Sequence, residues 1–203
     1  MVSEVFFDVE TQRLFADIES DDPGKLGISV VSVLTRTGDP DGNIKETMRS
    51  FWENELSGMW QLFTPADRII GFNSLSFDIP ALSPYSPPAF SKLPHFDIFA
   101  RVRDATGKKL GLATLARDTL GRDKSDIGTN AVMYWNRKDP ASLEKLRKYC
   151  EADVYLTRDL YDYGFRNRKL MYRDKWNEIR TFEVDFSYPR PDPGDPGTQM
   201  GLF

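Results

Sequence analysis

The sequence contains one cysteine and one histidine among its 203 residues. A single cysteine excludes an intrachain disulfide framework and fits a reducing compartment. No apolar run approaches the ~20 residues that span a bilayer, and the N-terminus lacks the basic-then-apolar pattern of a signal peptide. We therefore expect a soluble, cytoplasmic protein without a membrane partner.

The net charge of −4 is unevenly distributed along the chain. Residues 1–99 hold 7 Lys and Arg against 15 Asp and Glu, whereas residues 100–180 hold 19 against 12. An acidic half beside a basic half suits a metal site next to a polyanion track. Charge alone, however, favours an ordinary solvated surface over that interpretation.

The hydrophobic pattern predicts alternating strands and helices. Expected strands cover residues 2–9, 25–35, 44–51, 66–73 and 94–99, and the first three form an antiparallel meander. Expected helices cover residues 53–63, 78–85, 97–105, 110–120, 127–137 and 140–163, followed by a hairpin of 170–174 and 179–184. This order predicts an α/β fold with a mixed five-stranded sheet flanked by helices. The predicted division is a domain over 1–165, a hairpin extension over 166–188, and a flexible Pro/Gly linker with a terminal peptide over 189–203.

Two acids, Asp8 and Glu10, lie in the first predicted strand, FFDVET. Residues at i and i+2 face the same side of a strand, so these carboxylates point together with Phe6, and Val5, Phe7 and Val9 point into the core. Their mutual repulsion is relieved by a bound hard cation, Mg²⁺ or Mn²⁺. Taken alone, the pair is explained more simply by a strand end with two solvated acids.

Two further acids, Asp78 and Asp153, lie in predicted helices. Asp78 precedes a helix start, where Asp is also a common N-cap. Asp153 shares the apolar face of its helix with Tyr149, one turn earlier. A carboxylate on that face needs a partner, either a buried Arg or a metal shared with the strand acids.

These segments resemble the DEDD superfamily of 3′–5′ exonucleases, which have a ribonuclease H-like fold. FFDVET resembles the first motif, NSLSFD the second and YCEAD the third in its tyrosine form. The resemblance covers residues 4 to about 165, and it extends to the proofreading domains of family-B DNA polymerases and to helicase-associated stand-alone exonucleases. In the alternative subgroup a histidine stands five residues before the last Asp. That position is Lys148 here, and His95 is far from the motif, so the tyrosine form (DEDDy) is favoured.

The resemblance implies two divalent cations, Mg²⁺ or Mn²⁺, held by Asp8, Glu10, Asp78 and Asp153. Tyr149 would orient the attacking water. The expected activity releases nucleoside 5′-monophosphates from the 3′ end of DNA, most simply single-stranded DNA, in repair or replication. Two alternatives are an RNA 3′-trimming exoribonuclease and a non-catalytic adaptor that binds a clamp or nucleic acid.

Candidate substrate contacts are Thr11, Asn73 and Phe77, which ordinary turn and core positions also explain. Lys124 and Ser125, in the loop before the helix predicted over 127–137, are further candidates. A second group of basic residues could contact the phosphates of the bound strand. It consists of Lys108, Lys109, Arg166, Arg168 and Lys169, and an ordinary solvated surface explains these residues equally well.

The chain ends in QMGLF, which resembles the peptide that binds the bacterial sliding clamp. Gln199, Leu202 and Phe203 would be the anchoring residues, on a Pro/Gly tether that raises the local concentration of the enzyme at the clamp. Gly201 departs from the usual pattern, and a frayed terminus explains the same residues.

Overall fold

The computed structural model describes residues 2–38, 43–122 and 128–188. A five-stranded sheet has the order β3-β2-β1-β4-β5. Its strands are β1 (Val2–Thr11), β2 (Ile28–Gly38), β3 (Ile44–Trp52), β4 (Arg68–Gly71) and β5 (His95–Asp97). Strands β1, β2 and β3 pair antiparallel, as the meander predicts, whereas β4 runs parallel to β1 and β5 parallel to β4. The predicted mixed α/β sheet is confirmed.

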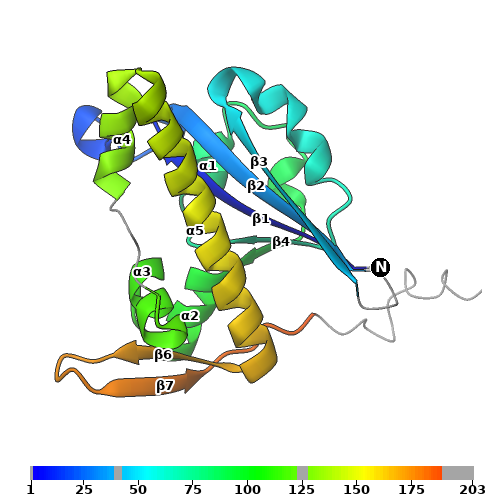
Figure 1. Ribbon diagram of the computed structural model, residues 1–203, viewed down its shortest axis with the longest axis vertical. Helices are drawn as coiled ribbons and strands as arrows, with labels where there is room; N and C mark the ends of the chain where they lie inside the picture. The colour runs from blue at the N-terminus through cyan, green and yellow to red at the C-terminus, as the bar shows by residue number, and fades with distance from the viewer. Residues whose placement is uncertain (1, 39–42, 123–127, 189–203) are drawn as a thin grey trace, which may run out of the picture.

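Helices cover the two faces of this sheet (Figure 1). The α-helices are α1 (Asp78–Leu82), α2 (Ile98–Thr106), α3 (Leu112–Leu115), α4 (Gly128–Arg137) and α5 (Pro140–Asn167). Short 3₁₀ turns are η1 (Phe15–Asp17), η2 (Pro23–Lys25), η3 (Glu53–Gly58), η4 (Trp60–Leu62) and η5 (Phe90–Lys92). Within the described residues, no helix is long and apolar enough to cross a membrane.

Two predicted helices differ in type from the expectation. Residues 53–63 form the tight turns η3 and η4, which still bury Leu56, Met59 and Phe63 on one side. The helix predicted over 110–120 begins as α3 and continues as the π-helical segment η6 (Ala116–Leu120). Apolar spacing identifies a helical segment but does not distinguish one helical hydrogen-bond pattern from another.

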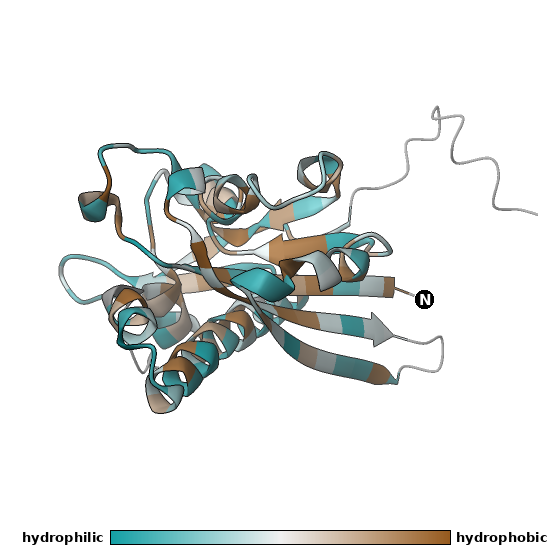
Figure 2. Cartoon of the chain, turned by 90° about the horizontal axis from the view of Figure 1, so that it is seen from above, coloured by the Kyte–Doolittle hydropathy of each residue, from teal (hydrophilic) through white to brown (hydrophobic). Residues whose placement is uncertain are grey.

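Both faces of β1 are buried. Val5, Phe7 and Val9 pack beneath η3, η4 and α1, as expected. Phe6, predicted to point with the acids away from the core, is also fully buried, in a second core that includes Val154 of α5. Because α5 crosses this second face, the strand acids point towards a helix rather than towards solvent (Figure 1). Figure 2 shows hydrophobic residues along the strands between these layers.

A two-stranded hairpin follows α5, with β6 (Lys169–Arg173) paired antiparallel to β7 (Ile179–Glu183). The predicted hairpin pairing is therefore confirmed. The hairpin extends beside α2 and α3, away from the main sheet (Figure 1). The division of the chain into a domain, an extension and a linker stays a prediction.

Residues 184–188, which we call the C-terminal strap, return from the hairpin to the main domain. The Phe186 ring packs directly on Gly164 of α5, where even a Cβ would overlap it. Arg68 donates hydrogen bonds to the carbonyl oxygens of Phe186 (2.6 Å) and Ser187 (2.8 Å). The Tyr188 hydroxyl donates to Glu4 Oε1 at 2.6 Å, which joins the strap to β1.

Candidate active site

Asp8 and Glu10 lie in the second half of β1. Asp8 is opposite Ser32 and Glu10 is opposite Val30 in the ladder with β2, and the register shifts between Glu10 and Thr11. The pleat therefore directs both carboxylates to the face that α5 covers. The shift marks an irregularity directly after Glu10, where the strand leaves the regular ladder.

Helix α5 brings Asp153 to the same face. Its N-cap is Asp139, whose carboxylate accepts a hydrogen bond from the backbone N–H of Ser142 at 2.9 Å. Asp153 is only 4% exposed, and carboxylate oxygens of Asp8, Glu10 and Asp153 all lie within 4.8 Å of one another. Segments distant in the sequence thus form one cluster of three acids.

Tyr149 lies one turn before Asp153 on α5 and is buried beside the cluster. Its side chain is hydrogen-bonded to Asp153. Burial, followed by the negative charges of Asp153, Glu10 and Asp8, raises the pKa of the Tyr149 hydroxyl well above its ordinary value. The phenol therefore stays protonated at neutral pH and acts as a hydrogen-bond donor rather than a base.

Asp78 is the first residue of α1 and is buried near this cluster. Burial raises the pKa of its carboxyl to about 8. Hydrogen bonds with the backbone of Asp78 and Val9 lower the pKa but do not offset this effect. The charges of Asp97 and Asp153 add to the increase. Among the described residues, the group within 4.8 Å contains Asp8, Glu10 and Asp153 but not Asp78. Of the four acids predicted from the sequence, the structure brings Asp8, Glu10 and Asp153 into one group and leaves Asp78 outside it.

Asp97 is a buried acid that the sequence analysis missed. It ends β5 and caps α2, and its Oδ1 accepts hydrogen bonds from the backbone N–H groups of Asn73 (2.8 Å) and Ala100 (3.3 Å). Its Oδ2 accepts from the N–H of Leu75 at 3.0 Å. Asp97 therefore holds the turn that leads into Asp78. The only signal in the sequence was an Asp where the strand predicted over 94–99 overlaps the helix predicted over 97–105.

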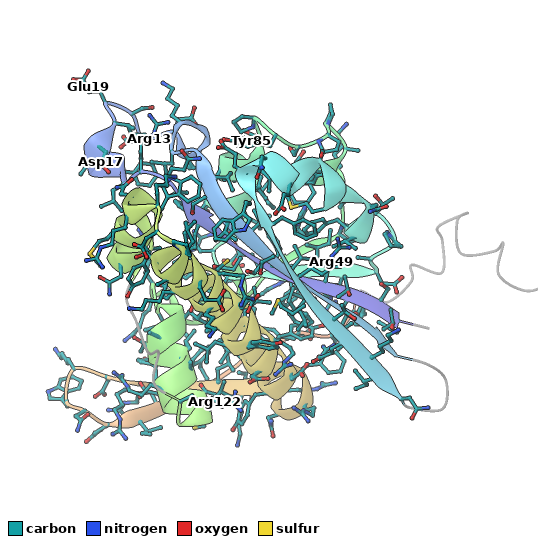
Figure 3. All side chains as sticks on the ribbon, turned by 45° about the horizontal axis from the view of Figure 1, so that its top comes forward. Arg13, Asp17, Glu19, Arg49, Tyr85 and Arg122 are labelled. Carbon is teal, nitrogen blue, oxygen red and sulfur yellow. The ribbon has the colours of Figure 1, made fainter. Side chains whose placement is uncertain are left out.

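A second missed group supports the end of β1. Gln12 Nε2 donates to Glu53 Oε2 (2.7 Å) and to the carbonyl of Ile28 (2.8 Å). The Tyr85 hydroxyl donates to Glu53 Oε1 at 2.6 Å. Arg13, which donates to the carbonyl of Leu26, lies at the same end of the molecule as Tyr85 (Figure 3). These contacts fix the chain directly after Glu10.

The predicted substrate contacts are partly described. Thr11 is buried, and its hydroxyl donates to the carbonyl of Arg13 at 2.9 Å. Asn73 has a left-handed backbone, with φ of 64°. The Phe77 ring packs edge-on against Phe15, with the centroids 6.1 Å apart. Their contact with nucleic acid stays a prediction.

Other predicted positions separate into surface residues and residues outside the described ranges. The basic residues predicted to contact the phosphates of the strand are all exposed. They are Lys108, Lys109, Arg166, Arg168 and Lys169. Lys124, Ser125 and the terminal residues Gln199, Leu202 and Phe203 lie outside the described residues.

The two positions weighed for the histidine subgroup lie away from the acids. Lys148 is exposed and pairs with Glu144 at 3.4 Å. His95 begins β5, with Nε2 2.8 Å from the carbonyl oxygen of Phe90, and burial lowers the pKa of its imidazole. His95 packs among aromatic rings of the first core.

The chemistry of the acid cluster fits a hard divalent cation. Three carboxylates offer only oxygen ligands, the type that Mg²⁺ and Mn²⁺ prefer. A cation would also offset the repulsion among three negative charges in a largely buried site.

A family model of the RNase_H superfamily matches residues 5–164. The chain belongs to the RNase_H superfamily. Among solved structures, it is similar to a family B DNA polymerase from the hyperthermophilic archaeon Pyrobaculum calidifontis, with 21% identity and a TM-score of 0.56. That likeness covers 81% of this chain but only 24% of the polymerase, and it supports the RNase H-like fold alone. A search of curated proteins found no match.

Proposed function

We propose that this chain is a metal-dependent 3′–5′ exonuclease of the tyrosine subgroup, acting on single-stranded DNA. The observation that carries the proposal is the group of Asp8, Glu10 and Asp153, whose carboxylate oxygens lie within 4.8 Å of one another. Membership of the RNase_H superfamily supports a nuclease. The 3′–5′ direction and the subgroup are inferred from the three motifs, FFDVET, NSLSFD and YCEAD.

In this proposal, Asp8, Glu10 and Asp153 would hold one cation, and Asp78 would support a second. Two divalent cations in such a site supply stabilisation of the charge that develops on the attacking and leaving oxygens of the phosphodiester. Asp78 must release its proton before it can act as a ligand, because burial raises the pKa of its carboxyl to about 8. Asp97 holds the turn that leads into Asp78 and so supports its position at the start of α1.

Tyr149 orients the attacking water through its hydroxyl. The hydroxyl is protonated at neutral pH, because burial and the neighbouring acids raise the pKa of the phenol. Its one hydrogen is bonded to Asp153 in the structure, so its oxygen orients the water as an acceptor and does not remove a proton. Thr11 and Asn73, at the ends of neighbouring strands, are proposed to contact the terminal nucleotide.

The proposal is tested with 5′-labelled and 3′-labelled single-stranded oligonucleotides of matched DNA and RNA sequence, in Mg²⁺ or Mn²⁺. We expect mononucleotide release from the 3′ end of DNA, loss of activity in EDTA, and at least 100-fold slower hydrolysis by Asp8→Asn. The Tyr149→Phe variant should lose activity while still binding the cation. Asp104→Asn, an exposed acid on α2, serves as the control and should be fully active.

The outcome of this assay separates the alternatives. Hydrolysis confined to RNA would favour a trimming exoribonuclease, and activity that survives EDTA or Asp8→Asn would refute the proposal. Clamp binding through Gln199, Leu202 and Phe203 is a separate proposal. Deletion of residues 199–203 should abolish binding to a bacterial sliding clamp and leave the hydrolysis of short oligonucleotides unchanged.

A further inference from the structure

The β6–β7 hairpin and the end of α2 form a groove of about 710 Å³. Its lining combines aromatic and basic side chains: Lys108, Tyr172, Lys175, Trp176, Arg180 and Phe182. The hairpin projects from the domain beside α2 and α3 (Figure 1). None of the acids proposed for catalysis lines this groove.

The hairpin is held firmly by one of its two strands. The backbone N–H of Met171 in β6 donates to Thr119 Oγ1 at 2.9 Å, and Thr119 Oγ1 donates back to the Met171 carbonyl at 3.1 Å. The N–H of Arg173 donates to Asp118 Oδ2 at 2.7 Å. Both partners come from the π-helical segment η6. These contacts attach β6, which carries Tyr172 of the groove, to the main domain.

Trp176, in the hairpin turn, is 68% exposed and gains little from packing within this chain. The Lys175 ammonium lies 4.3 Å from its ring centroid, and the Lys108 ammonium lies 4.9 Å from that of Tyr172. Within the part of the chain that the structure describes, neither lysine forms an ion pair. The groove therefore presents aromatic faces next to uncompensated positive charge.

The one acid in the groove is already neutralised. Asp174 Oδ1 accepts hydrogen bonds from the backbone N–H groups of Trp176 (2.9 Å) and Glu178 (3.1 Å). Its Oδ2 accepts from Arg180 Nε at 2.7 Å. The carboxylate thus shapes the turn and does not oppose the binding of an anion.

We propose that this groove is a second binding site for single-stranded nucleic acid. A base stacks on Trp176, whose ring is 68% exposed, and phosphates lie against Lys108 and Lys175. Aromatic platforms beside basic side chains are the features that bind single strands without sequence preference. The inference rests on the proposed nuclease function, because the strand bound in the groove is taken to continue to the acids. Binding in the groove does not itself require hydrolysis.

The length of α5 gives a scale for a strand that reaches from the acids to the base of the hairpin. From Asp153 to the end of α5 at Asn167, the helix spans about 21 Å at 1.5 Å per residue. At roughly 3.4 Å per stacked nucleotide, this distance corresponds to about six nucleotides. Trp176 lies in the turn between β6 and β7 rather than at this base, and we expect a four-nucleotide substrate whose 3′ end lies at the acids to leave it unoccupied.

The binding test uses fluorescence anisotropy in EDTA with labelled 20-nucleotide poly(dT) and poly(U). Trp176→Ala should bind about 5- to 150-fold more weakly, the range for the loss of one stacked base, and Trp176→Phe should restore most of the affinity. For the double variant Lys108→Ala/Lys175→Ala, the negative slope of log K against log salt should become shallower by about 1.4.

Controls remove a similarly exposed apolar side chain and two exposed lysines elsewhere on the surface. Ile44→Ala removes an apolar side chain that is 67% exposed on β3, and Lys45→Ala/Lys92→Ala removes two exposed lysines. Both controls should bind as the unmodified protein does. Equal affinity and equal salt slope in the hairpin variants and the controls would overturn the inference, as would failure of the unmodified protein to bind either oligonucleotide.

Hydrolysis provides a separate readout. The hairpin variants should raise KM for the 20-nucleotide substrate and leave KM for a four-nucleotide substrate unchanged, with kcat unchanged for both. An unchanged KM for the longer substrate would overturn the inference and leave the proposed nuclease intact. Binding that depends on the hairpin, with no metal-dependent hydrolysis, would support the inference and refute the proposed nuclease.

Discussion

Asp97 Oδ1 accepts a hydrogen bond of 2.8 Å from the backbone N–H of Asn73. Together with the bond from Leu75 to Oδ2, it fixes the turn between β4 and α1. Gly71, at the end of β4, leaves room for this turn, since a Cβ there would lie 2.5 Å from the Ser74 Cβ. The position of Asp78 thus depends on an acid that is not itself proposed to bind the cation.

Asp97→Ala tests that dependence. Loss of the acceptor leaves buried N–H groups unsatisfied, which should lower the free energy of unfolding by about 1–3 kcal/mol. The Mg²⁺ concentration needed for half-maximal hydrolysis should rise. For Asp97→Asn, which keeps one acceptor oxygen, this concentration should lie between the values for Asp97→Ala and the unmodified protein. Asp139→Ala removes a similar cap from α5 and should lower stability without changing the Mg²⁺ requirement. An unaltered Mg²⁺ requirement in Asp97→Ala would contradict this role.

Asp78 should make the stability of the metal-free protein depend on pH. Burial raises the pKa of its carboxyl from 3.8 to about 8, so the folded state keeps a proton that the unfolded state releases. The resulting stabilisation is complete below about pH 4 and is lost as the pH rises to about 8. In urea unfolding with EDTA, the unmodified protein should lose stability between pH 5 and 9 relative to Asp78→Asn. Parallel pH profiles of the two proteins would rule out the shift.

Removal of Asp153 should separate the effect of charge repulsion from that of cation binding. In EDTA, Asp153→Asn should melt at a higher temperature than the unmodified protein, because one of three clustered charges is gone. In Mn²⁺ at about 100 times its Kd, the unmodified protein should gain about 2.7 kcal/mol, and Asp153→Asn much less. Differential scanning fluorimetry with and without Mn²⁺ measures both. An equal gain in the two proteins would place the cation elsewhere.

Gly164 and Phe186 should be coupled energetically. Gly164→Ala places a Cβ against the Phe186 ring, and overpacking of this kind costs about 1–3 kcal/mol. Phe186→Ala removes a buried ring at about 3–5 kcal/mol. The double variant should be less destabilised than the sum, since the clash disappears with the ring. Gly58→Ala, with open space around it, should be close to neutral, and strict additivity of the first pair would show that the strap does not pack on α5 as described.

The sequence allowed the local part of the site to be predicted. Asp8 and Glu10 share a face because of the strand period, and Tyr149 and Asp153 because of the helix period. Both relationships depend on neighbours along the chain. That α5 buries this face, with Phe6 beneath it, follows from which element packs on which side of the sheet, a relationship that no local pattern contains.

The supporting contacts were missed for the same reason. Gln12 and Glu53 are separated by 41 residues, and Asp97 reaches back 24 residues to Asn73. Each is a polar residue at the end of a strand or turn, where exposure to solvent is the ordinary outcome. Only the assembled sheet brings these groups to the backbone that they hold.

The hydrogen bond from Tyr188 to Glu4 joins positions 184 residues apart. Arg68, the first residue of β4, likewise donates hydrogen bonds to the carbonyl oxygens of Phe186 and Ser187, which are made late in synthesis. During synthesis, the first strand is therefore made long before its last partner leaves the ribosome. Contacts this distant must overcome the entropy of closing a large loop, which slows their formation. We expect a nascent chain that ends at residue 165 to remain a loosely packed intermediate, and the native domain to be completed only after translation has passed the strap.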